Sequence, residues 1–139
     1  MTRAASDEAY VVDLCDKILG LKSKRQHRFD FLLGDSNSAG RQAKLPVDAY
    51  YEELGLVIEY WERQHQNPTP FWDRRMTPSG CTRGEQRRIY DERRREVLRA
   101  RGIGLVVLTF EQLDHAANGK LRRNNSVDEK AIRAALSVL

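Results

Sequence analysis

Two carboxylates, Asp48 and Glu59, stand on two short predicted strands within residues 45–65. Asp48 lies in an alternating apolar pattern, and the apolar run 56–58 leads directly into Glu59, with Gly55 providing the turn between the strands. Burying an unpaired carboxylate costs several kcal/mol, so packing alone does not explain why an acid stands at either position. Two acids on paired strands can share a divalent cation, and their hard oxygen ligands suit Mg²⁺ or Mn²⁺.

The same stretch resembles the core of the PD-(D/E)XK nuclease superfamily. Pro-Val-Asp at 46–48 corresponds to the first half of that motif, and Glu-Tyr-Trp at 59–61 corresponds to the second half. The branch that resembles very-short-patch-repair endonucleases is the closest in pattern, because polar residues and a histidine follow the second acid. Trp61 occupies the lysine position of the motif, which moves the prediction for that role to Gln64 or His65. The resemblance implies a metal-dependent endonuclease that hydrolyses DNA phosphodiester bonds.

The implied hydrolysis needs a residue that activates the attacking water, and the candidates for it follow Glu59 in the sequence. His65 is the best candidate for a base, since the ordinary pKa of histidine lies near working pH, whereas Gln64 could only orient the water. His65 lies at an even offset from Glu59 and Glu62 at an odd one, so Glu62 would point away in a regular strand. A strand end after Trp61 would change both assignments. The alternative is that this segment is simply a polar exit from the strand.

Glu8 is a third candidate acid. It falls in the first turn of a helix predicted over 7–19, which begins after Ser6 and ends before Gly20. An acid in a first turn commonly does no more than favour the positive end of the helix. The resemblance implies a metal-assisting glutamate on the first helix, and Glu8 fits that place better than Asp13 or Asp16.

A basic segment follows in the second half of the chain. The chain carries a net charge of +4, and residues 83–101 hold eight arginines against four acids, which matches that whole excess. This concentration indicates a polyanionic partner, most simply DNA, although phosphate contacts do not distinguish DNA from RNA. The alternative is a solvated helix with ion pairs between successive turns. The predicted phosphate-contacting residues are Arg83, Arg87, Arg88, Arg94 and Arg95.

Arg94 differs from the other arginines because it falls on the apolar stripe of that helix, between Tyr90 and Leu98. An arginine in such a place needs an acid or a phosphate as partner. Asp91, the predicted site acids and the substrate all remain open as that partner.

The predicted elements describe one α/β domain over residues 1–139. Helices are expected at 7–19, at 85–101 and from the S-x-x-E capping box at Ser126; strands are expected at 28–33, 45–51, 56–58 and 105–108. The resulting order, α-β-β-β-α-β-α, predicts a mixed sheet flanked by helices. The same order is implied by the resemblance, which corresponds to a restriction-endonuclease-like core.

The composition bears on the cellular location of the protein. Two cysteines make no disulfide framework, and no segment has the apolar length of a leader or a membrane span, so we expect a soluble, cytoplasmic protein. A symmetric dimer would cut both strands of a duplex most simply, but a nicking monomer fits equally well. The main alternative function is a nuclease-like fold that has lost its chemistry and binds DNA.

Overall fold

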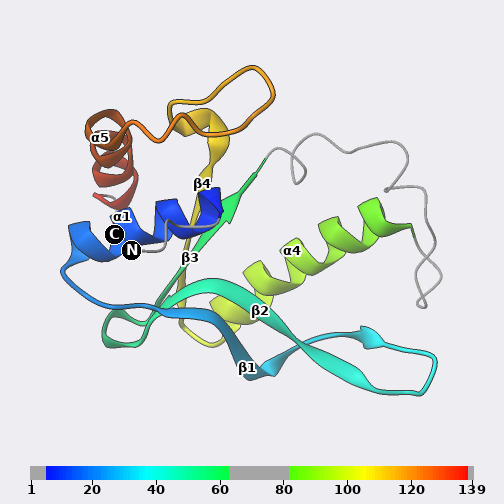
Figure 1. Ribbon diagram of the computed structural model, residues 1–139. Coiled ribbons are helices and arrows are strands. Elements are labelled where there is room, and N and C mark those ends of the chain that lie inside the picture. Colours follow the sequence, from blue (N-terminus) through cyan, green and yellow to red (C-terminus); the bar gives the residue numbers. More distant parts are fainter. Residues whose placement is uncertain (1–5, 63–81, 138–139) are drawn as a thin grey trace.

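The sheet and helices follow the order expected from the sequence. The computed structural model describes residues 6–62 and 82–137, and there the order is α-β-β-β-α-β-α with a four-stranded mixed sheet (Figure 1). The α/β class is therefore confirmed. The helices are α1 (Asp7–Leu19), α4 (Arg83–Ala100) and α5 (Asn125–Leu136), with short 3₁₀ turns η1 (Glu52–Leu54) and η2 (Phe110–Gln112); the strands are β1 (Lys24–Ser36), β2 (Gln42–Tyr51), β3 (Leu56–Trp61) and β4 (Gly104–Thr109).

The strands lie in the order β1-β2-β3-β4. The first three are antiparallel neighbours, whereas β3 and β4 are parallel, which requires a crossover connection that includes α4. Helices α1 and α5 pack together on one face of the sheet, and α4 packs on the other (Figure 1). The sheet is thus held between two helical layers.

Helix α1 has the boundaries that the sequence predicts. The Ser6 side chain accepts a hydrogen bond from the backbone of Ala9, and Gly20 ends the helix with φ of 66° in the left-handed region. Its apolar side, which includes fully buried Val11 and Cys15, faces the sheet and α5. None of the helices that the structure describes has the length and apolar character that a membrane crossing needs.

The two strands of the parallel pair differ in burial. Residues 56–60 of β3 are all buried, as expected for a central strand covered on both faces. The sequence predicts the same for β4, but Leu108 alone is buried there. That prediction was wrong because β4 forms an edge of the sheet, where one side of the strand has no neighbouring strand.

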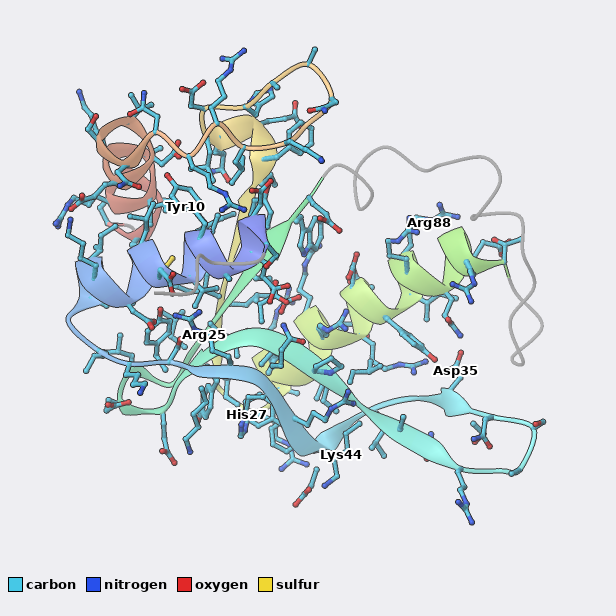
Figure 2. The ribbon with its side chains drawn as sticks, in the orientation of Figure 1. Tyr10, Arg25, His27, Asp35, Lys44 and Arg88 are labelled. Atoms are coloured by element: carbon cyan, nitrogen blue, oxygen red, sulfur yellow. The ribbon has the colours of Figure 1, made fainter. Side chains whose placement is uncertain are left out.

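The first hairpin is longer than the strands predicted at 28–33 and 45–51, since β1 runs from Lys24 to Ser36 and β2 from Gln42 to Tyr51. The pairing shifts between Arg28 and Leu33, and Leu32 is fully buried within the shifted segment. Figure 2 shows Asp35 on this hairpin, close to α4. The backbone N–H of Asp35 donates to the Tyr90 hydroxyl at 2.8 Å, and Arg93 of α4 pairs with the Asp35 carboxylate at 2.8 Å.

The last helix also departs from its prediction. Helix α5 begins at Asn125 after Asn124, so the capping box at Ser126 does not start it. Val127, expected to face inward, is 49% exposed, while Asp128 is completely buried. The reason is a partner distant in the sequence, because the Tyr10 hydroxyl donates to the Asp128 carboxylate at 2.5 Å.

Candidate active site

The hydrogen-bonded ladder between β2 and β3 ends at the two predicted acids. Regular pairing extends as far as Ala49 and Ile58, and the next pair in the same register would be Asp48 with Glu59. There the side chains replace the backbone partners. The Asp48 N–H donates to Glu59 Oε2 at 2.7 Å, and the Tyr60 N–H donates to Asp48 Oδ2 at 2.8 Å. Each carboxylate is thus held by the backbone of the opposite strand.

Residues from four elements converge beside these acids. Helix α1 contributes Glu8 and α4 contributes Arg94, from opposite faces of the sheet (Figure 1). They line one cavity of about 260 Å³ together with the two strand acids. The residues that line this cavity, which we call the acid cavity, are Ser6, Glu8, Pro46, Asp48, Glu59, Tyr60, Glu62 and Arg94. The structure therefore brings together all three predicted metal-binding acids and one of the predicted arginines.

Glu59 is the most buried acid of the cavity, with 6% of its surface exposed. Burial raises the pKa of its carboxyl to about 8, and the negative charge of Asp48 adds to the rise. The Asp48 N–H and the Arg94 charge act in the opposite direction. Glu59 is therefore held in a place that disfavours its ionised form.

Glu8 shows the same behaviour from the other side of the cavity. Burial raises its pKa to about 7, and the charge of Asp48, a hydrogen bond with Asp48 and the charge of Glu62 contribute to the rise. A hydrogen bond from Gln26 acts in the opposite direction. Because Glu8 and Glu59 both face Asp48, the group has fewer than its full number of negative charges at neutral pH when no cation is bound.

Arg94 is the cation that lines the acid cavity. Its Nε donates to the Pro46 carbonyl at 3.1 Å, and its Nη1 donates to Asp91 Oδ1 at 3.1 Å. The Glu59 carboxylate lies 4.0 Å from Nε. Asp91 and Glu59, two of the partners left open by the sequence, therefore both lie beside it. With 15% of its side chain exposed, Arg94 is fixed at the cavity wall by α4 and β2 together.

The chemistry of these donors fits a hard divalent cation. The cavity offers carboxylate oxygens, the ligands that Mg²⁺ and Mn²⁺ prefer, and the mutual repulsion of the acids would be relieved by positive charge. Among residues 6–62 and 82–137, no three His, Cys, Asp or Glu side chains stand at positions that could already hold an ion together. Glu8, Asp48 and Glu59 are thus neighbours whose side chains must rotate to share a ligand.

At position 62 the structure decides between two alternatives that the sequence left open. Glu62 would point away from the site in a regular strand, but the strand ends after Trp61, and Glu62 lines the acid cavity. The alternation of side chains therefore stops before Glu62. Trp61 itself lies beneath Arg95, whose guanidinium carbon is 6.0 Å from the centre of the indole ring. The lysine position of the motif therefore faces α4.

The other predicted arginines lie away from the acid cavity. Arg83 and Arg87 belong to the first turns of α4, and Arg95 covers Trp61. Arg88 borders a separate hollow of about 500 Å³ along α4, with Ile89, Glu92, Arg93 and Glu96. Gln64 and His65 fall outside the described residues, so their predicted roles stay predictions.

Three residues of the site were missed by the sequence reasoning. Ser6 lines the cavity in addition to capping α1, Glu62 lines it beyond the end of β3, and Gln26 of β1 donates its side-chain amide to Glu8 at 2.5 Å. The S-D-E sequence at 6–8 signals a helix start, which conceals the second role of Ser6. Gln26 carries no signal in its own neighbourhood, because its partner lies on another element.

No family model, no curated protein and no solved structure matches this chain. The geometry of the acid cavity and the short motif at 46–48 and 59–61 therefore carry the functional argument together.

Proposed function

We propose that this chain is a metal-dependent endonuclease of the PD-(D/E)XK type that hydrolyses DNA. The observation that carries the proposal is the convergence of Glu8, Asp48 and Glu59 on one cavity where the ladder between β2 and β3 opens. Burial and the charge of Asp48 raise the pKa of both Glu8 and Glu59, which is an unfavourable arrangement unless something positive binds among these acids. Phosphodiester hydrolysis with a divalent ion uses such a group.

Each residue has a distinct task in this proposal. Glu8, Asp48 and Glu59 would hold Mg²⁺ or Mn²⁺, which would supply positive charge and a more acidic water at the scissile phosphate. The backbone N–H groups of Asp48 and Tyr60 keep two of these carboxylates oriented. Because both donors belong to the sheet, they hold the acids without flexible side chains.

Arg94 would contact the phosphate. A cavity lined by acids repels a DNA backbone, and Arg94 is the cation that lines it in the described part of the chain. Its contacts with Pro46 and Asp91 use Nε and one hydrogen of Nη1, and the planar guanidinium has further N–H donors. These could bind a phosphate oxygen and stabilise the charge that develops there.

Other arginines of α4 support a nucleic acid as the substrate. Arg88, Arg95 and Arg99 are exposed along a helix that also provides Arg94 to the cavity. Phosphate contacts by such residues would position the duplex without reading its sequence. DNA is proposed over RNA because of the resemblance in the motif, not because of these contacts.

A second candidate function is a DNA-binding module of the same fold without catalytic activity. Two observations favour it: Trp61 occupies the lysine position, and the acids of the described residues are not yet arranged to hold an ion. In that case arginine substitutions on α4 would weaken DNA binding, and substitution of the acids would change nothing.

The decisive test is cleavage of supercoiled plasmid with Mg²⁺, with Mn²⁺ and with EDTA. Wild type, Glu59→Gln and Asp48→Asn are compared with Glu53→Gln, which neutralises an exposed acid in the turn before β3. We expect metal-dependent nicking or linearisation that falls at least about 1000-fold in the two site variants and is unchanged in Glu53→Gln. Cleavage that persists in Glu59→Gln and Asp48→Asn would contradict the proposal. A salt-sensitive gel shift without cleavage by any of the proteins would favour the binding module.

A further inference from the structure

Gln26 has a backbone conformation that is unusual for its residue type. Its φ is +49°, and Gln26 and Arg123 are the two residues other than glycine with positive φ in the described chain. L-residues avoid this region because Cβ approaches the backbone, at a cost of about 1–2 kcal/mol. Such strain is retained where the surroundings require a particular side-chain position.

The position of Gln26 in the sheet is equally specific. Its neighbours Arg25 and His27 pair with Ala49 and Val47 of β2, so Gln26 stands across from Asp48. From there its Nε2 donates to Glu8 Oε2 at 2.5 Å. Through its side chain, Gln26 thus connects α1 to the position on β1 that lies opposite Asp48, a predicted metal ligand.

We propose that Gln26 is a positioning residue that holds the Glu8 carboxylate toward Asp48 in the acid cavity. The inference rests on the proposed nuclease function and extends it, because Gln26 does not line the cavity and would act through Glu8. A donor to the outer side of a metal-binding carboxylate orients it and limits its alternative rotamers.

The chemistry of an amide suits this task. Glu8 could have been fixed by a cation, as happens one residue earlier, where Arg25 donates to Asp13 and Asp16 at 2.8 Å each. A guanidinium at Glu8 would neutralise the carboxylate and compete with a bound divalent ion. The neutral amide of Gln26 orients Glu8 and leaves its negative charge for the ion.

The test separates the side chain from the backbone strain. Gln26→Gly removes the amide and relieves the strain, because glycine adopts positive φ readily. Gln26→Asn keeps an amide and a residue that tolerates this region, but its side chain is one methylene too short for the same contact. Lys24→Gly is the control, since it adds the same flexibility two residues earlier on β1, at a surface ion pair with Glu52.

Three measurements are made on each full-length protein: thermal unfolding, Mn²⁺ affinity by calorimetry and plasmid cleavage. For Gln26→Gly we expect a Tm equal to or above that of wild type, with Mn²⁺ affinity and cleavage each lowered about 10-fold. Gln26→Asn should show the same losses in affinity and cleavage. Lys24→Gly should keep both within twofold of wild type.

If the wild type is active, two results would overturn this inference and leave the proposed function standing. Affinity and cleavage within twofold of wild type in Gln26→Gly would show that the contact with Glu8 has no role in the site. A fall in Tm of several degrees in Gln26→Gly would assign Gln26 to stability instead. A wild type that neither binds Mn²⁺ nor cleaves DNA would overturn the proposed function and this inference with it.

Discussion

Two buried acids, Asp128 of α5 and Glu59 of β3, have very different surroundings. Asp128 receives the Tyr10 hydroxyl on Oδ2 at 2.5 Å and the Asp114 N–H on Oδ1 at 2.9 Å, so each oxygen has a donor. Figure 2 shows Tyr10 on α1, on the side toward α5. Glu59 receives one N–H on Oε2, while Oε1 lies 4.0 Å from Arg94.

The difference separates a structural acid from a candidate catalytic one. The donors around Asp128 compensate its burial and join α5 to α1, so its surroundings are complete within the protein. The neighbours of Glu59 include other carboxylates, which raise its pKa and leave its negative charge poorly compensated. Burial alone does not mark a candidate functional acid, whereas burial among other acids does.

Removing Asp128 should produce the largest loss of stability. Asp128→Ala leaves the Tyr10 hydroxyl and the Asp114 N–H without their acceptor, and we expect the free energy of unfolding to fall by about 3 kcal/mol. Urea denaturation measures the change, and Ser126→Ala, on the exposed start of α5, is the control. A change below about 1 kcal/mol would contradict the assignment of Asp128 as a structural acid.

The acid cavity should make the metal-free protein less stable as pH rises. Glu8 and Glu59 have folded-state pKa values raised to about 7 and about 8, above the ordinary glutamate value of 4.5. The folded state therefore binds more protons than the unfolded state in this window. The stabilising contribution is complete below about pH 4.5 and is lost as pH passes through 7 and 8.

In EDTA we expect a loss of about 2 kcal/mol between pH 5 and pH 8.5, measured by urea denaturation across that range. Saturating Mg²⁺ should restore most of it at the higher pH, since the ion compensates the ionised acids. A metal-free stability that rises steadily from pH 5 to pH 8.5 would show that the acids do not repel one another as described.

Glu59→Gln should increase the free energy of unfolding, by less than Asp128→Ala decreases it. Without divalent ions at pH 8.5, the neutral amide removes one charge from the repelling group, and we expect stability to increase by about 1 kcal/mol. The increase should disappear at pH 5, where Glu59 is already protonated in the folded protein. Urea denaturation at both pH values tests this, with Glu53→Gln as the unaffected control.

The smallest effect concerns the outer face of α4. Arg88→Gln removes an exposed charge from the proposed DNA-contacting surface and should leave stability unchanged. If Arg88 contacts a phosphate, the slope of log K against log salt concentration should fall by about 0.9. Arg133→Gln on α5 removes the same charge elsewhere and should leave the slope unaltered. Equal slopes for wild type and Arg88→Gln would exclude that contact.

Local signals were enough to predict much of the fold. Ser6 and Gly20 delimit α1 by capping, and the apolar run at 56–58 identifies the central strand, because both signals depend on adjacent residues. The burial of Leu32 was missed because it follows from a shift in strand pairing. The burial of Asp128 was missed because it depends on a hydroxyl group from α1. Neither cause can be seen within a short window of sequence.

The same distinction applies to the candidate site. Asp48 and Glu59 could be predicted because each is a lone acid on a short apolar strand, and the structure places them side by side. Glu62 was missed because its direction depends on where β3 ends. Gln26 was missed because its role depends on a backbone angle and on a partner in α1, which become visible only in three dimensions.

The parallel pairing of β3 with β4 has a consequence for the order of folding. The β1–β2 hairpin connects near neighbours in the chain and can form early, whereas β4 can join β3 only after the long crossover that contains α4 has been traversed. The acid cavity needs residues from α1, β2, β3 and α4, so it is complete only when α4, which lies within that crossover, has packed on the sheet. A partly folded chain therefore has the hairpin but lacks the assembled group of acids.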